Sequence, residues 1–108
     1  MLRFKGITTN GPEPGLLADF WQQALDYERR HLWEPYVGLR DPAGRDPLLT
    51  FQRVPDAQPN SLHLDLYADD VEAETDRLVG LGAQRVRRVE EGDTWWWVLR
   101  DPAGTCSA

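Results

Sequence analysis

The chain has 108 residues, of which 41% are hydrophobic, and this composition is typical of one globular domain of ordinary size. Its 12 lysines and arginines and 18 aspartates and glutamates give a net charge of −6, which disfavours duplex nucleic acid and anionic membrane surfaces as partners. No apolar run is long enough to span a bilayer, and the single cysteine, Cys106, cannot form an internal disulfide. These features predict a cytoplasmic protein.

The first half of the chain predicts a strand, a helix and then further strands. A short strand is expected at Phe4–Thr9, and the breaker cluster Asn10–Pro14 separates it from a helix that runs to about Tyr27. Apolar residues on this helix recur at the spacing of one buried stripe. The stripe consists of Leu16, Leu17, Phe20, Trp21, Ala24 and Leu25.

The second half repeats this order of elements. A strand is predicted over Ser61–Ala68, and its alternation separates two faces. Leu62, Leu64, Leu66 and Ala68 share the face expected to cover a helix, and His63, Asp65 and Tyr67 share the other, which is either solvent-facing or the wall of a cavity. A helix over Val71–Leu81 should follow, with Asp69 or Asp70 as its N-cap and Gly82 just after its end.

A six-residue sequence occurs twice, at Leu39–Gly44 and at Leu99–Gly104, with an offset of 60 residues. Its Asp-Pro-Ala-Gly core is typical of a turn. The repeat is either two similar hairpin turns or part of a duplicated module. Because strand, helix and strands precede both copies in the same order, we interpret it as a duplication within a single domain, residues 1–108, with module one at about 1–55 and module two at about 60–108.

Four motifs cover nearly the whole chain in order. They are Leu17–Trp21 with Leu25, Leu48–Pro55, Leu62–Leu66 with Asp70–Glu74, and Trp97–Gly104. Together they resemble the vicinal oxygen chelate superfamily, the glyoxalase and bleomycin-resistance fold, and in particular its small glyoxalase-like domains of actinobacterial type. The resemblance implies an α+β fold in which two βαβββ modules form a curved mixed sheet, with helices on the outer face and the ligand on the concave face.

The resemblance also implies four metal-ligand positions in metal-dependent members, on the first and last strands of each module. His63 matches one position, and Gln52 is a weak candidate at another. The third falls on Ile7, or on Gly6 if the two helices differ in length by one residue, and neither side chain can bind a metal. The fourth offers only Cys106. We therefore expect no metal and no other cofactor.

Polar and aromatic side chains are the candidates for ligand binding on the concave face. They are His63, Asp65, Tyr67, Gln52, Trp33, Trp95 and Trp97. His63 is either a relic that hydrogen-bonds in a cavity wall or a general base tuned by Asp65. The tryptophans are either core residues or a stacking wall for a flat ligand, and strand alternation places Trp96 opposite to Trp95 and Trp97.

A small basic cluster, Arg85, Arg87 and Arg88, follows the second helix. It is expected to be a solvated edge strand whose charge is offset by Glu90, Glu91 and Asp93, and an anionic-substrate site is the alternative.

These features favour a metal-independent small-molecule-binding protein with a flat, largely apolar ligand. One alternative is a metal-dependent lyase, isomerase or dioxygenase that uses His63 and Gln52. Another is an interaction module whose pocket is filled by its own aromatic residues. A homodimer is expected because open sheet edges invite pairing and members of the superfamily commonly dimerise, with Trp33 or Trp96 near the contact.

Overall fold

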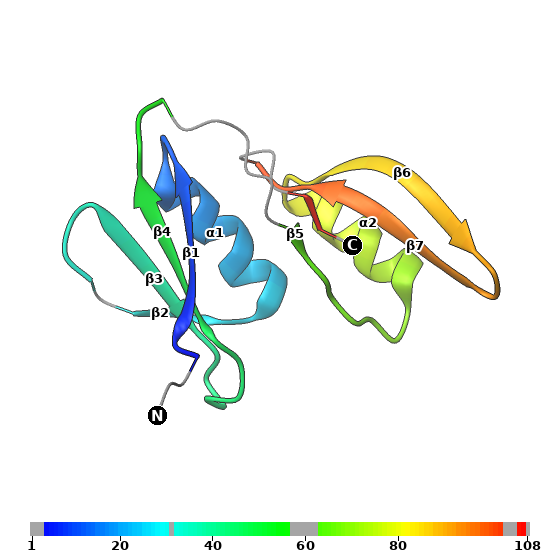
Figure 1. The fold of residues 1–108 in the computed structure, drawn as a ribbon, viewed down its shortest axis with the longest axis horizontal. Coiled ribbons are helices and arrows are strands. Elements are labelled where there is room, and N and C mark those ends of the chain that lie inside the picture. Colours follow the sequence, from blue (N-terminus) through cyan, green and yellow to red (C-terminus); the bar gives the residue numbers. More distant parts are fainter. Residues whose placement is uncertain (1–3, 31, 57–62, 103–105, 108) are drawn as a thin grey trace. The chain divides into compact units, whose positions relative to one another are not determined.

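The structure is a computed structural model that describes residues 4–30, 32–56, 63–102 and 106–107 (Figure 1). It divides into two compact units, Met1–Gln58 and Pro59–Ala108, called module one and module two below. Each module is described by itself. None of the helices in the described ranges is both long and apolar enough to cross a membrane.

Both modules follow the same path of strand, helix and three strands. Module one contains β1 (Gly6–Gly11), α1 (Pro14–Leu25), β2 (Glu28–Arg30), β3 (Tyr36–Arg40) and β4 (Leu48–Arg53). Module two contains β5 (His63–Leu64), α2 (Val71–Leu81), β6 (Gln84–Glu91), β7 (Thr94–Arg100) and β8 (Cys106–Ser107).

The two sheets also share one strand order. Module one has the order β1-β4-β3-β2 and module two the order β5-β8-β7-β6. In each sheet the first and last strands of the module pair in parallel, and the other pairs are antiparallel. The predicted α+β fold of two βαβββ modules is therefore confirmed, and each sheet is mixed.

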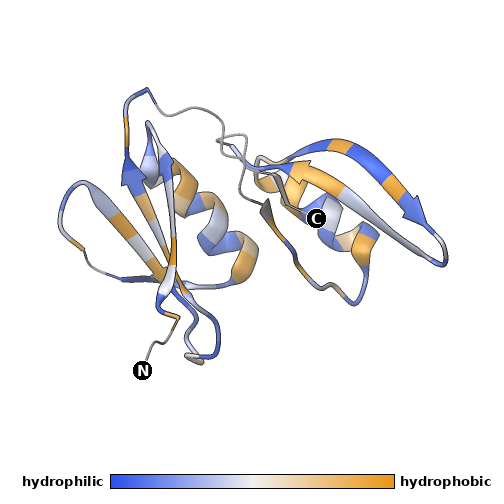
Figure 2. Cartoon of the chain, in the orientation of Figure 1, coloured by the Kyte–Doolittle hydropathy of each residue, from blue (hydrophilic) through white to orange (hydrophobic). Residues whose placement is uncertain are grey.

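The core of module one lies between α1 and its sheet. Leu17, Trp21 and Ala24 are buried on α1, and Phe51 of β4 is 2% exposed. Leu16 was predicted to join this stripe, but it is 58% exposed because the stripe centres on Leu17 and Trp21 and leaves Leu16 on the flank. Figure 2 shows hydrophobic bands along α1 and the central strands of this module.

The first strand is shifted from its predicted position. It was expected at Phe4–Thr9, but β1 spans Gly6–Gly11, and Phe4 is 73% exposed. The strand continues into the breaker cluster because β4 supplies ladder partners as far as the pair Gly11 and Arg53. A Cβ at Gly11 would lie 2.8 Å from Leu17 Cδ1, so glycine also allows the close approach of α1.

The second helix begins and ends where the sequence predicts. Asp70 is its N-cap, and its Oδ1 accepts a hydrogen bond of 3.1 Å from the Ala73 amide. Gly82 ends the helix with a φ of 121°, a conformation that glycine adopts without steric cost. The buried face of α2 consists of Thr75 and Leu78.

The strand predicted over Ser61–Ala68 is much shorter in the structure. β5 spans His63–Leu64, and Ser61 and Leu62 lie outside the described residues. Its parallel partner β8 provides two ladder pairs, and the residues after Leu64 have no further strand partner in the described part of the chain. Leu64 and Leu66 are half-buried, whereas Ala68 is exposed.

The predicted turn forms between β3 and β4. The Gly44 amide donates to the Asp41 carbonyl at 2.9 Å, and Gly44 has a φ of 69°. The Asp41 carboxylate accepts hydrogen bonds from the amides of Ala43, Arg45 and Asp46, which lowers its pKa. The second copy of the turn includes Ala103 and Gly104, which lie outside the described residues.

Candidate functional site

Each sheet has one face that bears a helix and one that does not. In module one, Leu39, Leu49 and Phe51 are buried towards α1, and paired residues on adjacent strands share a face. The helix-free face of module one therefore consists of Gly6, Thr8, Asn10, Glu28, Arg30, Tyr36, Gly38, Arg40, Leu48, Thr50 and Gln52.

The helix-free face of module one is mostly polar and contains one ion pair. Arg40 Nη2 lies 2.6 Å from Glu28 Oε1 in an ion pair. Gln52, a predicted site residue, lies directly opposite Tyr36, whose side chain is 41% exposed. A Cβ at Gly38 would lie 2.8 Å from Leu32 Cδ1, so the Leu32 side chain covers that position.

In module two, Trp95 and Trp97 lie on the face that bears α2. Leu99 is buried on this face, and Trp97 Nε1 donates a hydrogen bond of 2.8 Å to Glu72 Oε1 of α2. Period-two alternation places Trp95 beside Trp97 and directs Trp96 to the opposite face. The tryptophan on the helix-free face of β7 is therefore Trp96, whereas Trp95 and Trp97, which were predicted to line the ligand site, lie on the helix-bearing face.

Arginines of β6 stack on the two helix-side tryptophans. The Arg88 guanidinium lies 4.3 Å from the centre of the Trp95 ring, and the Arg85 guanidinium lies 5.3 Å from that of Trp97. Arg85 also forms an ion pair with Asp76 of α2. The helix-bearing face is thus closed by cation–π contacts and ion pairs.

The helix-free face of module two carries a different set of side chains. The ladder pairs Val89 with Trp96, Arg87 with Val98, and Gln84 with Arg100. An extra residue, Val86, forms a bulge between Arg85 and Arg87, so that these two arginines lie on opposite faces. We call the group Trp96, Val89, Val98, Arg87 and Arg100 the Trp96 patch.

The remaining predicted residues lie elsewhere. Trp33, 80% exposed, lies in the turn before β3, and Asp65 and Tyr67 are exposed after β5. The His63 side chain lies outside what the structure describes, although its backbone pairs with Cys106 of β8. Within module one, Gln52 lies on the helix-free face, and Trp33 lies outside the sheet before β3.

Sequence reasoning missed Arg100 and gave Trp96 only a contact role. Leu99 is the residue that assigns the two faces of β7. It occupies the same place in the repeated sequence as Leu39, and both side chains are buried under a helix. Counting back from Leu99 in steps of two assigns Trp97 and Trp95 to the helix side and leaves Trp96 and Arg100 on the other.

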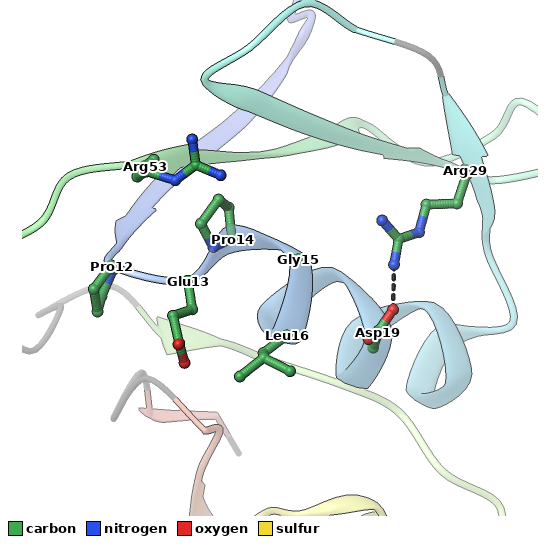
Figure 3. Close-up of a pocket in the computed structure, with 8 residues that line it drawn as sticks. All are labelled: Pro12, Glu13, Pro14, Gly15, Leu16, Asp19, Arg29 and Arg53. Carbon is green, nitrogen blue, oxygen red and sulfur yellow. Dashed lines mark hydrogen bonds and ion pairs between the residues drawn. The ribbon is translucent and has the colours of Figure 1, made fainter.

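An open hollow of about 640 Å³ lies at the start of α1 in module one (Figure 3). Its lining consists of Pro12, Glu13, Pro14, Gly15, Leu16, Asp19, Arg29 and Arg53. Arg29 is paired with Asp19, as Figure 3 shows, and Arg53 lies 2.6 Å from Glu34. Because both cations already have carboxylate partners and no predicted site residue lines the hollow, we do not assign it as the site.

The residues of module one do not fit the metal-ligand positions implied by the resemblance. Gly6 and His63 each begin the first strand of their module, and α1 is one residue longer than α2, so Gly6 takes the position equivalent to His63. A Cβ at Gly6 would lie 2.4 Å from the Leu48 carbonyl oxygen. Among the described residues, no group of three or more His, Cys, Asp or Glu could hold a metal ion.

Several solved structures share this fold. A glyoxalase/bleomycin resistance/dioxygenase family enzyme from Burkholderia phytofirmans aligns with a TM-score of 0.77 and 15% identity over 95% of this chain and 93% of the other. The fosfomycin resistance protein FosX from Listeria monocytogenes gives a TM-score of 0.79 and 13% identity over 99% and 90%.

A third similar structure is the bleomycin-binding protein of Streptomyces verticillus in complex with copper(II)-bleomycin. It aligns with a TM-score of 0.62 and 18% identity over 99% of this chain and 95% of the other. No curated protein sequence matches the chain. The family model of the glyoxalase-like domain matches residues 6–106. Because that match spans almost the whole chain, the protein belongs to the glyoxalase-like domain family.

Proposed function

We propose that this protein binds a flat, largely apolar small molecule on the helix-free side of its sheets and needs no metal to do so. The observation that carries the proposal is the Trp96 patch. There an indole ring and two valines, Val89 and Val98, lie on a sheet face that α2 does not cover. An aromatic surface of this kind offers stacking and apolar contact to a planar ligand.

Two similar structures support a small-molecule role. The Streptomyces verticillus protein is described as bleomycin-binding, and the Listeria monocytogenes protein as a fosfomycin resistance protein. These descriptions concern those proteins, and the low identity carries over only the fold.

The proposal that no metal is needed rests on Gly6. A metal site of the superfamily type needs side chains from both modules, and Gly6 has neither a side chain nor space for one. Gln52 contributes only a neutral amide to the same face. Metal analysis of the protein, purified without a histidine tag, should find less than one divalent ion per chain. A stoichiometric ion would favour the alternative, a metal-dependent lyase, isomerase or dioxygenase.

Ligand binding is tested by calorimetric titration with neutral flat aromatic compounds, starting with naphthalenemethanol. The Trp96→Leu variant should bind roughly tenfold more weakly than the wild type, because it loses the stacking surface. Trp95→Leu is the matched control, since Trp95 lies on the face of α2, and it should keep the wild-type affinity. Equal losses in both variants, with folding verified by circular dichroism, would contradict the assignment.

We also propose a cytoplasmic homodimer. The single cysteine suits a reducing compartment, and Trp33, with 80% of its surface exposed, provides an aromatic contact of the kind found at interfaces. Light scattering at micromolar concentration should give twice the chain mass of 12.4 kDa. A mass equal to that of one chain would exclude the dimer.

A further inference from the structure

Arginines in this chain are generally paired with carboxylates. Six ion pairs join described arginines to acidic side chains, and they are Arg29–Asp19, Arg40–Glu28, Arg53–Glu34, Arg77–Glu74, Arg85–Asp76 and Arg88–Glu90. Pairing is expected where acidic residues outnumber basic ones by 18 to 12. Within the described part of the chain, Arg30, Arg45, Arg87 and Arg100 have no such partner.

Two of these unpaired arginines, Arg87 and Arg100, belong to the Trp96 patch. Arg87 lies opposite Val98, which makes it a diagonal neighbour of Trp96 at roughly 7–8 Å between backbones, within reach of a long side chain. Arg100 follows Val98 on the same face of β7. Both guanidinium groups therefore belong to the same side of the indole ring along the strand.

On the opposite face of the same two strands, each arginine beside a tryptophan also has a carboxylate partner. Arg88 stacks on Trp95 and has Glu90 Oε1 at 3.3 Å, and Arg85 stacks on Trp97 and pairs with Asp76. Each unit combines an indole, a guanidinium and a carboxylate. Trp96 and Arg87 provide the first two of these groups on the helix-free face, and no carboxylate among the described residues pairs with Arg87 there.

Glu91 places a negative charge beyond one end of the Trp96 patch, so the two ends differ in charge. It lies on the helix-free face at the other side of Trp96, opposite Thr94. Arg87 and Glu91 are four residues apart on a strand, roughly 13 Å, which is too far for an ion pair between them. An anionic group is therefore attracted towards Arg87 and Arg100 and repelled from the Glu91 end.

We propose that the ligand of the Trp96 patch is a small planar aromatic carboxylate. This inference rests on the proposed function and specifies its ligand class. The ring stacks on Trp96 between the two valines, and the carboxylate accepts hydrogen bonds from the Arg87 guanidinium, whose planar fork matches a carboxylate. Arg100 adds positive charge at the same end. Because the whole chain has a net charge of −6, nonspecific attraction does not account for binding of an anion.

The test compares two probes of the same ring system, naphthoate and the neutral naphthalenemethanol, by calorimetric titration at low salt. Naphthoate should bind the wild type roughly tenfold more tightly than the alcohol. Arg87→Gln should remove this advantage and leave the affinity for the alcohol unchanged. Arg88→Gln is the matched control, because Arg88 lies on the helix-bearing face, and it should leave both affinities unchanged.

Two further variants sharpen the result. Arg87→Lys should recover part of the preference for naphthoate, since it restores the charge without the planar fork. Glu91→Gln should strengthen naphthoate binding a fewfold by removing a like charge.

The outcomes separate this inference from the proposed function. If both probes bind the wild type equally and Arg87→Gln changes neither affinity, the anionic ligand is refuted while the apolar site stands. If neither probe binds at millimolar concentration, both proposals fail. All variants are first verified as folded by circular dichroism and thermal unfolding, so that a loss of affinity reports on the patch itself.

Discussion

Module one and module two share strand order and connectivity but use their aromatic residues differently. In module one, Phe20 and Trp21 are buried in an edge-to-face contact with ring centres 5.2 Å apart, and Phe51 is also buried. In module two, Trp95, Trp96 and Trp97 are all half-buried, and the buried hydrophobic residues described are Leu78, Ala83 and Leu99. One topology thus supports a deep core in one copy and an accessible aromatic strand in the other.

The helix-free faces of the two modules also differ in how their charged side chains are paired. In module one this face carries an ion pair, Arg40 with Glu28, and one arginine without a described carboxylate partner, Arg30, among mostly neutral residues. In module two it carries Trp96 and two arginines without described carboxylate partners. Module one thus holds more of the buried packing that the structure describes, and module two carries an indole and two arginines on its helix-free face. This difference leads to three predictions.

The largest effect is expected from the core of module one. Phe51→Ala should lower the free energy of unfolding by about 3–5 kcal/mol, because the ring is 2% exposed between β4 and α1. Leu78→Ala, in the thinner core of module two, should cost about 2–3 kcal/mol. Urea denaturation measures both values. A larger loss for Leu78→Ala would reverse the assignment of the main core to module one.

Replacing a glycine by alanine should change stability by an intermediate amount, with a loss in module one and a gain in module two. Gly6→Ala should destabilise module one by about 1–3 kcal/mol, since its Cβ would lie 2.4 Å from a backbone oxygen. Gly80→Ala in α2 should stabilise the protein by roughly 0.5–1 kcal/mol, because the site is open and alanine favours a helix. Thermal unfolding compares the two. A neutral Gly6→Ala would show that position 6 has room for a side chain.

The smallest effect concerns the repeated turn and its dependence on pH. The pKa of Asp41 is lowered below its ordinary value of 3.8 by hydrogen bonds from the backbone amides of Ala43, Arg45 and Asp46. A lowered folded-state pKa contributes stability above the unfolded value, and this contribution is lost as the pH falls below about 4.

Urea unfolding at pH 6 and at pH 3 measures this contribution. Asp41→Asn should be less stable than the wild type at pH 6, and the gap should narrow at pH 3. The same two measurements on Asp101→Asn compare the turn of module one with that of module two, because Asp101 is the equivalent buried carboxyl. A gap for Asp41→Asn that is independent of pH would show that its charged form is not what stabilises the turn.

The sequence alone predicted the parts of the fold that local chemistry determines. The duplication followed from the repeat, and both ends of α2 followed from Asp70 and Gly82, because capping depends on side chains close in the chain. The length of β5 was not predictable in this way. A strand lasts only as long as its neighbour supplies hydrogen bonds, and β8 provides two ladder pairs.

The candidate site was less predictable for a related reason. Alternation separated Trp96 from Trp95 and Trp97, but the side that faces a helix follows only once Leu99 is known to be buried. Period two also places Arg85 and Arg87 on one face, whereas the bulge at Val86 puts them on opposite faces. A bulge depends on the register between two strands, and no residue type in β6 predicts it.

That bulge also decides which side chains of β6 face the helix-free side. It takes Val86 out of the ladder, so that Arg87 follows Arg85 as the next ladder residue. If Val86 instead took a regular ladder position, Arg88 and Glu90 would lie on the helix-free face, and Arg87 and Val89 would turn towards α2. An apolar surface with a cation at one end would become an alternation of opposite charges, without any change of residue type. Loss or gain of a bulge, as well as substitution, is therefore expected to change the ligand preference of a sheet with this fold.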